Sequence, residues 1–383
     1  MGASWIRPLR RARVWTAAIG LALVLAAVAP AAAPALPPGF WGVSPQAIPS
    51  AEQFQRLSVG GVESVRIPIS WAAVQPTRGG APNFSGTDQL VAGAAEAGLE
   101  VLPFAYGAPT WAVRAATVPG SRGLTSAPLT LPVKSGLQRS SWAKFLELLV
   151  GRYGPGGTFW AENPTLPKRP IRIWQIWNEE NFKYFVVRPS PADYGKLLKV
   201  SYAAIHGADP GAKLVLGGMF AEPGEARYKL EPPQAFLATD FLDDLYRSTP
   251  GVQRTFIGVA LHPYTSEYQR LTPVIEAFRR VLAEHHDAGK GLWITEIGWS
   301  SEPLSRRDSF AKGPSGQVTQ LKGAFRLFER RQRRWNLKRV YWFSVDDAPG
   351  NCNFCGGSGL FGPGFVPKKS WFAYVRLAGG QAG

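Results

Sequence analysis

The sequence predicts one (β/α)8 barrel, an α/β fold of eight parallel strands alternating with eight helices, preceded by an N-terminal export signal. Short apolar runs alternate with longer amphipathic stretches from Phe40 onward, as in repeated strand–helix units around a parallel sheet. These units number close to eight, and neither a repeat nor a Pro/Ser-rich linker divides residues 40–383. Because such barrels often exceed about 250 residues, one domain can account for this whole segment.

The N-terminal segment has the pattern of an export signal. Four arginines within the first 13 residues precede an uncharged apolar run from Val14 to Val28, and alanine-rich sequence follows. This order is typical of a signal peptide. We expect cleavage after Ala35, with Ala31 as an alternative site. An uncleaved membrane anchor is the other interpretation, since the run approaches the ~20 residues needed to span a bilayer. Both interpretations predict that residues 40–383 lie outside the cytoplasm, secreted or at the cell surface.

Eight strands are expected at the apolar runs, most of them rich in β-branched residues, as strands buried on both faces require. In chain order they are Trp41–Val43, Ser64–Ile67, Glu100–Phe104, Ile171–Trp177, Lys213–Leu216, Phe256–Leu261, Gly291–Thr295 and Arg339–Phe343. The helical patterns between them are Ala51–Leu57, Thr87–Ala97, Ser140–Tyr153, Pro191–Ala208, Ala235–Arg247, Pro273–His286, Gly316–Arg333 and Ser370–Leu377. Thr87 and Asp88 are expected to cap the second helix, and Ser190 the fourth.

Two long loops follow predicted strands. Residues 107–135 and 346–363 are rich in Gly, Pro and Ser and lack helical periodicity, and loops of this kind form the site at the C-terminal face of a barrel. The second loop holds the only cysteines, Cys352 and Cys355. In an oxidising compartment we expect them to form a local disulfide. A closed zinc site needs about four ligands, so no metal is expected, and no organic cofactor either.

The chain is basic, with a formal charge of +16, or +12 once the four N-terminal arginines are removed. This charge favours an anionic glycan or a negatively charged cell envelope as a partner. The alternative, which we consider stronger, is that arginines simply keep the surface soluble. No nucleic-acid partner is expected, because the basic residues are scattered and no recognition motif is present.

Two glutamates at strand ends carry the candidate chemistry. Glu179 in QIWNEEN follows the fourth predicted strand, and Glu296 in WITEIGW ends the seventh. Polar residues at the C-terminal ends of barrel strands point toward substrate, and barrel closure would place these two across one cleft. Cleavage of a glycosidic bond requires such a pair of carboxyl groups.

These motifs resemble those of the clan A glycoside hydrolases, with families 39 and 5 the most similar. The resemblance covers nearly all of residues 40–378 and is strongest at Trp177–Glu179 (WNE) and Thr295–Trp299 (TEIGW). It implies that Glu179 is the acid/base and Glu296 the nucleophile of a reaction that retains anomeric configuration.

The same resemblance extends to further strand ends. It implies substrate-binding or supporting roles for Arg66 and Trp71 in VRIPISW, Asn178 in WNE, His262 and Tyr264 in ALHPY, and Trp342 in VYWFS. Arg66 would keep Glu296 ionised, and Tyr264 would donate to the same carboxylate. Trp111 and Trp299 lie on predicted site loops and are also expected to contact sugar, with packing in the core as the alternative.

Structural alternatives remain for several of these residues. Glu180 is the rival of Glu179 for the acid role, although the asparagine precedes Glu179. Arg66 could instead pair with Glu63 or another surface acid, and His262 and Tyr264 could serve only to complete hydrogen bonds at the top of the barrel. The other mature tryptophans that the pattern assigns to structural packing are Trp160, Trp174, Trp335 and Trp371.

The sequence thus predicts a retaining glycoside hydrolase that acts by double displacement on a β-linked polysaccharide or oligosaccharide. A transglycosylase would use the same residues, and a carbohydrate-binding barrel without activity would use the same cleft. The presence of both glutamates with Asn178 and Arg66 argues against the binding barrel. The substrate depends on loops around residues 107–135, 219–234 and 346–363, whose sequences do not indicate a particular sugar.

Overall fold

The computed structural model describes residues 1–2, 36–113, 130–222, 232–306, 308–350, 352 and 354–382. The chain divides into two units, Met1–Ala35 and Leu36–Gly383, and the second holds all the helices and strands considered below. The predicted export signal lies outside the described residues apart from its first two. Within the described part of the chain, no helix has the length and apolar character needed to cross a membrane.

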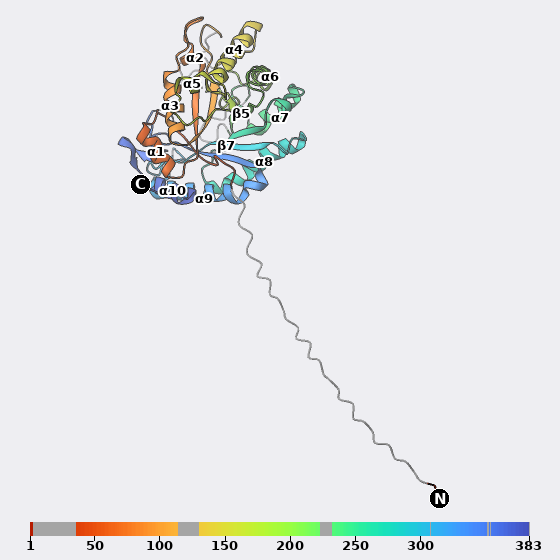
Figure 1. Ribbon diagram of the computed structural model, residues 1–383, viewed down its shortest axis with the longest axis vertical. Helices are drawn as coiled ribbons and strands as arrows, with labels where there is room; N and C mark the ends of the chain where they lie inside the picture. Colours follow the sequence, from red (N-terminus) through yellow and green to blue (C-terminus); the bar gives the residue numbers. More distant parts are fainter. Residues whose placement is uncertain are drawn as a thin grey trace. The chain divides into compact units, whose positions relative to one another are not determined.

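The second unit is a closed barrel of eight parallel strands, which confirms the predicted fold. Each strand pairs with its sequence neighbour, and β8 closes the ring on β1 through the register Trp41↔Val340 to Ser44↔Phe343. Helices surround the strands (Figure 1). The strands are β1 (Trp41–Ser44), β2 (Ser64–Ser70), β3 (Glu100–Tyr106), β4 (Ile173–Ile176), β5 (Lys213–Phe220), β6 (Gly258–His262), β7 (Gly291–Ile297) and β8 (Leu337–Phe343).

Ten helices belong to the described residues, and eight of them match the predicted helices to within a few residues at each end. They are α1 (Ala51–Val59), α2 (Trp71–Val74), α3 (Ser85–Glu96), α4 (Gly136–Tyr153), α5 (Thr158–Glu162), α6 (Pro191–Ala208), α7 (Ala238–Ser248), α8 (Leu271–Glu284), α9 (Gly313–Trp335) and α10 (Lys369–Ala378). The short helices α2 and α5 were not predicted. Three 3-10 turns, η1 (Val252–Thr255), η2 (Tyr268–Arg270) and η3 (Pro363–Phe365), and a hairpin of β9 (Phe361–Gly362) and β10 (Val366–Pro367) complete the elements.

The start of α6 is as predicted, whereas that of α3 is not. Ser190 caps α6, because its Oγ accepts a hydrogen bond from the backbone nitrogen of Asp193 at 3.3 Å. Helix α3 begins earlier, at Ser85, and its N-cap, Phe84, has no polar side chain to offer. The predicted cap at Thr87 and Asp88 is therefore wrong. Asp88 instead accepts hydrogen bonds from side chains of α4, which include the Tyr153 hydroxyl at 2.7 Å.

Side chains that point into the barrel form a core separate from the one beneath the helices. It consists of one buried residue from each of five strands: Leu102, Val215, Ala260, Trp293 and Tyr341. This cluster fills the barrel below its C-terminal end, as in other barrels of this type. The open end is therefore the one where the strand-to-helix loops lie.

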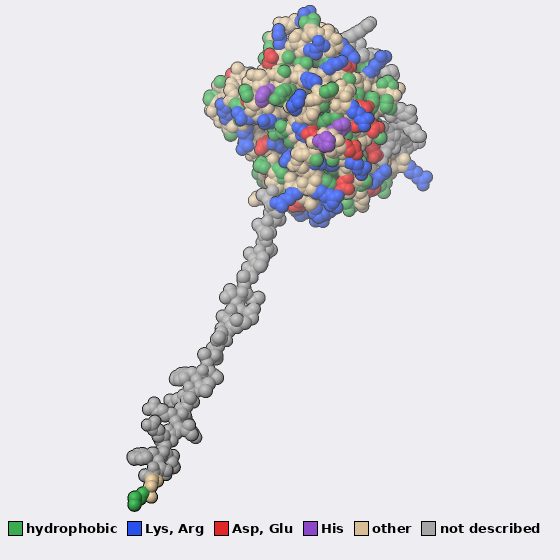
Figure 2. Space-filling view, turned by 90° about the vertical axis from the view of Figure 1, so that its right-hand side faces the viewer, with side chains coloured by type: hydrophobic (Ala, Val, Ile, Leu, Met, Phe, Trp, Pro, Cys, Tyr) green, Lys and Arg blue, Asp and Glu red, His purple; other side chains and the backbone are tan. Residues whose placement is uncertain are grey.

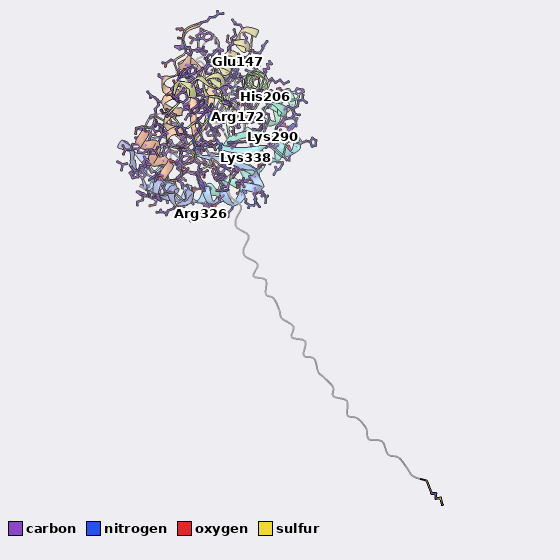
Figure 3. All side chains as sticks on the ribbon, viewed as in Figure 1. Glu147, Arg172, His206, Lys290, Arg326 and Lys338 are labelled. Carbon is purple, nitrogen blue, oxygen red and sulfur yellow. A yellow bond between two sulfur atoms is a disulfide. The ribbon has the colours of Figure 1, made fainter. Side chains whose placement is uncertain are left out.

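Basic side chains are dispersed over the surface. On the face in Figure 2, lysines and arginines are interspersed with acidic groups and form no single patch. Arg172, Lys290 and Lys338, labelled in Figure 3, lie at or near the starts of β4, β7 and β8. These cations are at the N-terminal end of the barrel, opposite the strand-to-helix loops.

Candidate active site

The turn after β4 holds Glu179 in an uncommon backbone conformation. Trp177 and Glu179 have φ angles of 70° and 41°, a left-handed region in which a non-glycine residue costs about 1–3 kcal/mol. Neighbouring strands hold the turn on both sides: the amide of Trp177 donates to Ala105 O at 2.8 Å, and that of Glu179 to Gly218 O at 3.2 Å. Such strain is typical of functional sites.

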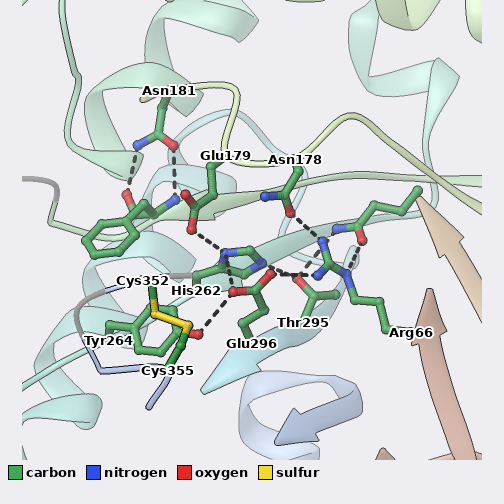
Figure 4. Close-up of polar contacts among 12 residues, drawn as sticks. Arg66, Asn178, Glu179, Asn181, His262, Tyr264, Thr295, Glu296, Cys352 and Cys355 are labelled. Atoms are coloured by element: carbon green, nitrogen blue, oxygen red, sulfur yellow. Dashed lines mark hydrogen bonds and ion pairs between the residues drawn. A yellow bond between two sulfur atoms is a disulfide. The ribbon is translucent and has the colours of Figure 1, made fainter. Parts of the chain in front are cut away.

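Barrel closure brings Glu179 and Glu296 together, as the sequence predicts (Figure 4). One carboxyl oxygen of each glutamate and one ring nitrogen of His262 all lie within 4.8 Å of one another. Glu179 is 7% exposed and Glu296 9% exposed. Two carboxyl groups this close and this dry cannot easily ionise together, so they differ in protonation over a wide pH range.

His262 connects the two sides of this cluster. Its Nδ1 lies 2.8 Å from Glu179 Oε1, and its Nε2 lies 3.0 Å from Thr295 Oγ1. Burial, and after it the charge of Arg66, lower the pKa of His262 well below its usual value, so the ring is neutral. A β-carbon at Gly218 would lie 1.9 Å from Nε2. Only glycine at position 218 therefore leaves room for this ring.

Arg66 on β2 binds three side chains, one from β4, one from the turn after β4 and one from β7. Its guanidinium donates to Glu296 Oε1 at 2.7 Å, Gln175 Oε1 at 2.7 Å and Asn178 Oδ1 at 2.5 Å, and it lies 4.0 Å from the centre of the Phe104 ring. It forms no pair with Glu63. Arg66 is 2% exposed, so its charge acts on Glu296 with little screening.

The pKa values of the two glutamates follow from these contacts. Burial, and next the charge of Glu296, raise the pKa of Glu179 well above its usual value. Burial also raises the pKa of Glu296, but the charge of Arg66 and the hydrogen bond from the Tyr264 hydroxyl at 3.0 Å act in the opposite direction. Glu296 is therefore the first of the pair to ionise, and Glu179 keeps its proton to higher pH.

Two asparagines of the β4 turn have separate tasks. The Oδ1 of Asn178 accepts a hydrogen bond from Arg66, so the amide nitrogen is directed elsewhere and can bind a substrate hydroxyl. Asn181 joins the turn to the segment after β5 through hydrogen bonds with Phe220 and Phe236, at 2.8–3.0 Å. Sequence reasoning missed Asn181 because neither its neighbours nor its spacing distinguishes it from a solvated loop residue.

An aromatic cluster lies beside the Glu296 carboxylate. The ring of Tyr264 is 5.2 Å from that of Phe354 and 5.9 Å from that of Phe310. Phe354 lies between Cys352 and Cys355, which form the predicted disulfide. The predicted disulfide loop therefore contributes an aromatic side chain to one side of the site.

Three tryptophans expected to contact sugar are packed in the core. Trp71, Trp299 and Trp342 are fully buried. Trp71 stacks on Phe145 of α4, and Trp342 packs between Trp299 and Phe325 of α9. Because none of the three rings is exposed, the sugar contacts expected from the sequence are wrong. Trp111 remains a candidate, since it is half-buried and donates only to Gln75 O at 2.9 Å.

Phe343 is better placed than Trp342 to meet a substrate. Side chains alternate along a strand, so Phe343 shares the inward direction of Tyr341, whereas Trp342 points toward α9. Phe343 is partly exposed at the end of β8, and its ring lies 6.0 Å from that of Phe354. The sugar contact expected of Trp342 is therefore wrong, because this side chain is fully buried against α9. The tryptophans Trp160, Trp174, Trp335 and Trp371 are buried, as expected for structural packing.

Glu180 does not face the cluster. It is fully buried, and its carboxyl group contacts Gly217 of β5 and faces Tyr194 of α6. This position excludes the alternative in which Glu180, rather than Glu179, protonates a bound substrate.

Glu179, His262 and Glu296 also form a donor set that a divalent cation could use. Arg66 lies 2.7 Å from Glu296, so a cation bound by that carboxylate would be placed close to a buried guanidinium. Like charges in a dry site repel strongly. The donor set therefore suits proton transfer better than metal binding.

Comparisons with known proteins support the fold. No protein-family model and no curated protein matches this sequence. Solved structures do match, with TM-scores near 0.6 and identities too low to show more than a shared fold. One is a family 39 glycoside hydrolase from Bacteroides cellulosilyticus, with 21% identity, a TM-score of 0.62, and coverage of 89% of this chain and 64% of that one.

Two other matches extend the comparison. A monomeric beta-xylosidase from Caulobacter crescentus has 19% identity and a TM-score of 0.60, over 90% of this chain and 69% of the other. Xylanase 10B from Thermotoga maritima has 15% identity and a TM-score of 0.57, over 89% and 94%. The resemblance to clan A glycoside hydrolases, inferred from motifs, thus holds at the level of fold. The chain spans about two thirds of the family 39 enzyme.

Proposed function

We propose that this protein is a retaining glycoside hydrolase that cleaves O-glycosidic bonds of a β-linked polysaccharide or oligosaccharide. The observation that carries the proposal is the short separation of the two carboxyl groups, with oxygens of both within 4.8 Å of one His262 nitrogen and of each other. Retaining enzymes have carboxyl groups about 5–5.5 Å apart, whereas inverting enzymes leave about 6.5–9.5 Å for a water molecule.

In the first step Glu296 attacks the anomeric carbon while Glu179 protonates the departing oxygen. Arg66 and Tyr264 each donate to one oxygen of Glu296, which favours its ionised form and orients the carboxylate. Burial and the charge of Glu296 keep Glu179 protonated. The amide nitrogen of Asn178 is available for the sugar 2-hydroxyl, an interaction that strengthens in the transition state.

In the second step water attacks the glycosyl–Glu296 ester. Once Glu296 has lost its charge in the ester, the charge repulsion that raised the pKa of Glu179 is removed. Glu179, which gave its proton to the departing oxygen in the first step, therefore stays ionised and removes a proton from the water that attacks the anomeric carbon. The bond from that carbon to Glu296 breaks, which restores the Glu296 carboxylate. The same carboxyl group thus acts as acid and then as base.

The substrate and the location of the enzyme rest on different arguments. Structures that share the fold include a beta-xylosidase, a xylanase and an exo-beta-1,4-mannosidase. Two of these names specify a β-linkage, and this favours a β-glycan. The basic, apolar and alanine-rich order of the first 35 residues favours export. We therefore place the activity outside the cytoplasm, on a glycan of the medium or the cell envelope.

Turnover of activated aryl β-glycosides tests the proposal. Glu296→Gln should abolish turnover while leaving glycan binding intact, and proton NMR of the first product of the unmodified enzyme should show the β-anomer. Glu147→Gln is the matched control, because Glu147 is an exposed residue of α4. Substantial hydrolysis by Glu296→Gln, or an α-anomer as first product, would contradict the mechanism.

Transfer to a sugar acceptor is a second candidate outcome for the same intermediate. Glu179 and Glu296 are at most 9% exposed, and aromatic rings flank Tyr264, so water has limited access. The ratio of hydrolysis to transfer with added acceptor distinguishes the two activities. Glycan binding without turnover of any substrate in a broad panel would instead indicate a carbohydrate-binding barrel.

A further inference from the structure

Glu180 is a buried acid that the proposed reaction does not use. It follows Glu179 directly, yet its side chain points away from the cleft and is 0% exposed. The carboxyl group lies over the α-carbon of Gly217, where a β-carbon would be 1.9 Å from Glu180 Oε2. Glycine at position 217 therefore makes the space that this carboxyl group fills.

The hydrogen bonds around Tyr194 determine the protonation state of Glu180. The Tyr194 hydroxyl accepts from Gly217 N at 2.7 Å and donates its one hydrogen to Ile176 O at 2.8 Å. Within the described part of the chain, neither oxygen of Glu180 has a hydrogen-bond partner of normal geometry, although the carboxyl group faces this hydroxyl. Because the Tyr194 hydroxyl has no second hydrogen to donate, a hydrogen bond between Glu180 and Tyr194 requires a proton on Glu180.

A neutral Glu180 completes the set of hydrogen bonds. Its O–H can donate to the remaining lone pair of the Tyr194 oxygen, which leaves the bonds to Ile176 and Gly217 intact. An ionised Glu180 would instead attract the tyrosine hydrogen, and Ile176 O would lose this donor. Ile176 immediately precedes Trp177, whose positive φ begins the strained turn.

We infer that Glu180 is a positioning residue: as a neutral acid it holds the β4 turn through Tyr194, and its ionisation releases the turn that carries Asn178 and Glu179. This inference rests on the proposed function, because the turn it controls carries the proposed acid/base. It accounts for an acidic residue in a buried place where the reaction needs no second acid.

The charges that face Glu180 agree with a neutral state near pH 7. Burial raises the pKa of Glu180 to about 8. Tyr194 on α6 and Arg66 on β2 act in the opposite direction but do not outweigh burial. Glu179, on the same turn, is repelled by an ionised Glu180, which would raise the pKa of Glu179.

Thermal unfolding tests the protonation state without any substrate. Unfolded glutamate has a pKa of about 4.3, so between that pH and about 8 the folded chain binds a proton that the unfolded chain has lost. Glu180 therefore reduces stability as pH rises through this window. In Glu180→Gln the fall in Tm from pH 5 to pH 8 should be smaller, by several degrees, than in the unmodified protein.

The control for this experiment is Glu147→Gln, which alters an exposed glutamate of α4 (Figure 3). It should reproduce the unmodified dependence of Tm on pH. If Glu180→Gln also reproduced it, Glu180 would not be a buried neutral acid and the inference would fail.

Kinetics test the positioning role. A 2,4-dinitrophenyl glycoside needs no acid to leave, so loss of the Glu179 proton should have little effect on its kcat/KM. Release of the turn by Glu180 should still reduce that kcat/KM at high pH, and Glu180→Gln should remove this loss. Glu180→Leu, which is neutral but cannot donate, should lower kcat about fivefold to tenfold at pH 6, the equivalent of one hydrogen bond.

Tyr194→Phe separates the positioning role from a general effect of the substitution. It should lower kcat as Glu180→Leu does, with the dependence of Tm on pH still governed by Glu180. Identical alkaline profiles for Glu180→Gln and the unmodified enzyme, or full activity of Tyr194→Phe, would overturn the positioning role. If the unmodified protein cleaved no glycoside, the proposed function and this role would fail together, while the Tm data would still decide whether Glu180 is neutral.

Discussion

Nη1 of Arg66 lies 2.7 Å from Oε1 of Glu296, and both side chains are almost completely buried. This pair connects β2 with β7 across the barrel and gives one of the two glutamates a positive neighbour. Glu179 has no ion pair with Arg66 and contacts a neutral histidine instead. Two chemically identical side chains therefore have different affinities for a proton.

A bell-shaped pH dependence of kcat/KM follows from this difference. The active form has Glu296 ionised and Glu179 protonated, so activity should rise as pH passes the lower apparent pKa of the pair and fall above the higher one. Because burial raises the pKa of both groups, both limbs should lie above the usual glutamate value of about 4.3. Initial rates with a substrate that has a poor leaving group measure this. Activity that stays flat well above neutral pH would contradict the assignment of Glu179.

Substitution of Arg66 should affect the acidic limb. Arg66→Met removes the charge that opposes protonation of Glu296, so the acidic limb should move to higher pH, while the alkaline limb from Glu179 moves less. Arg66→Lys keeps the charge but loses the fork that binds Gln175, Asn178 and Glu296. It should lower kcat/KM by roughly 100-fold, the size expected for a lost fixed donor. An unmoved acidic limb in Arg66→Met would show that Arg66 does not control Glu296.

Adjacent residues at the end of β8 should respond differently to substitution. Phe343→Ala removes a partly exposed inward ring and should raise KM with little change in Tm. Trp342→Ala creates a cavity against α9 and should destabilise the fold by about 3–5 kcal/mol, with KM almost unchanged in the folded fraction. Steady-state kinetics and urea unfolding of both variants measure this. A raised KM without loss of stability in Trp342→Ala would instead support the sugar contact that the sequence predicts for Trp342.

Removal of the disulfide should affect the site through Phe354. Cys352→Ser/Cys355→Ser releases a short loop, at a cost of about 2 kcal/mol by the loop-entropy model. Because Phe354 packs on Tyr264, which donates to Glu296, kcat should fall together with the loss of stability. Phe354→Leu, with the disulfide intact, should reproduce the fall in kcat but less of the destabilisation. Unchanged kinetics in both variants would show that the loop does not support Tyr264.

The features that sequence reasoning predicted share a physical cause. Each strand buried on both faces is a continuous apolar run, and each such run ends where a polar residue such as Glu179 or Glu296 begins. The number and order of the strands and the positions of the two glutamates could therefore be predicted from the sequence. Arg66, His262 and Tyr264 were predicted from the resemblance of their motifs to those of the clan A glycoside hydrolases, and the structure brings all three to the glutamates.

The features that were missed depend on which way a side chain points. Burial of both faces of a strand hides this direction in the sequence. When both faces of a strand are apolar, the alternation that separates inward from outward residues disappears from the sequence. Trp342 and Phe343 therefore look equivalent until the register with β1 is known. The positive φ of Trp177 and the pocket that Gly217 provides for Glu180 depend on neighbouring strands, so no local motif indicates them.

The arrangement of the site also determines when a folding chain can become active. Arg66, Glu179, His262 and Glu296 come from β2, from the turn after β4, and from β6 and β7, so no single strand–helix unit contains a working pair. Until these strands pair, the four groups are far apart along the chain and cannot form the site. Hydrolysis should therefore appear only with the last step of ring closure, and the rate at which activity returns during refolding would report that step directly.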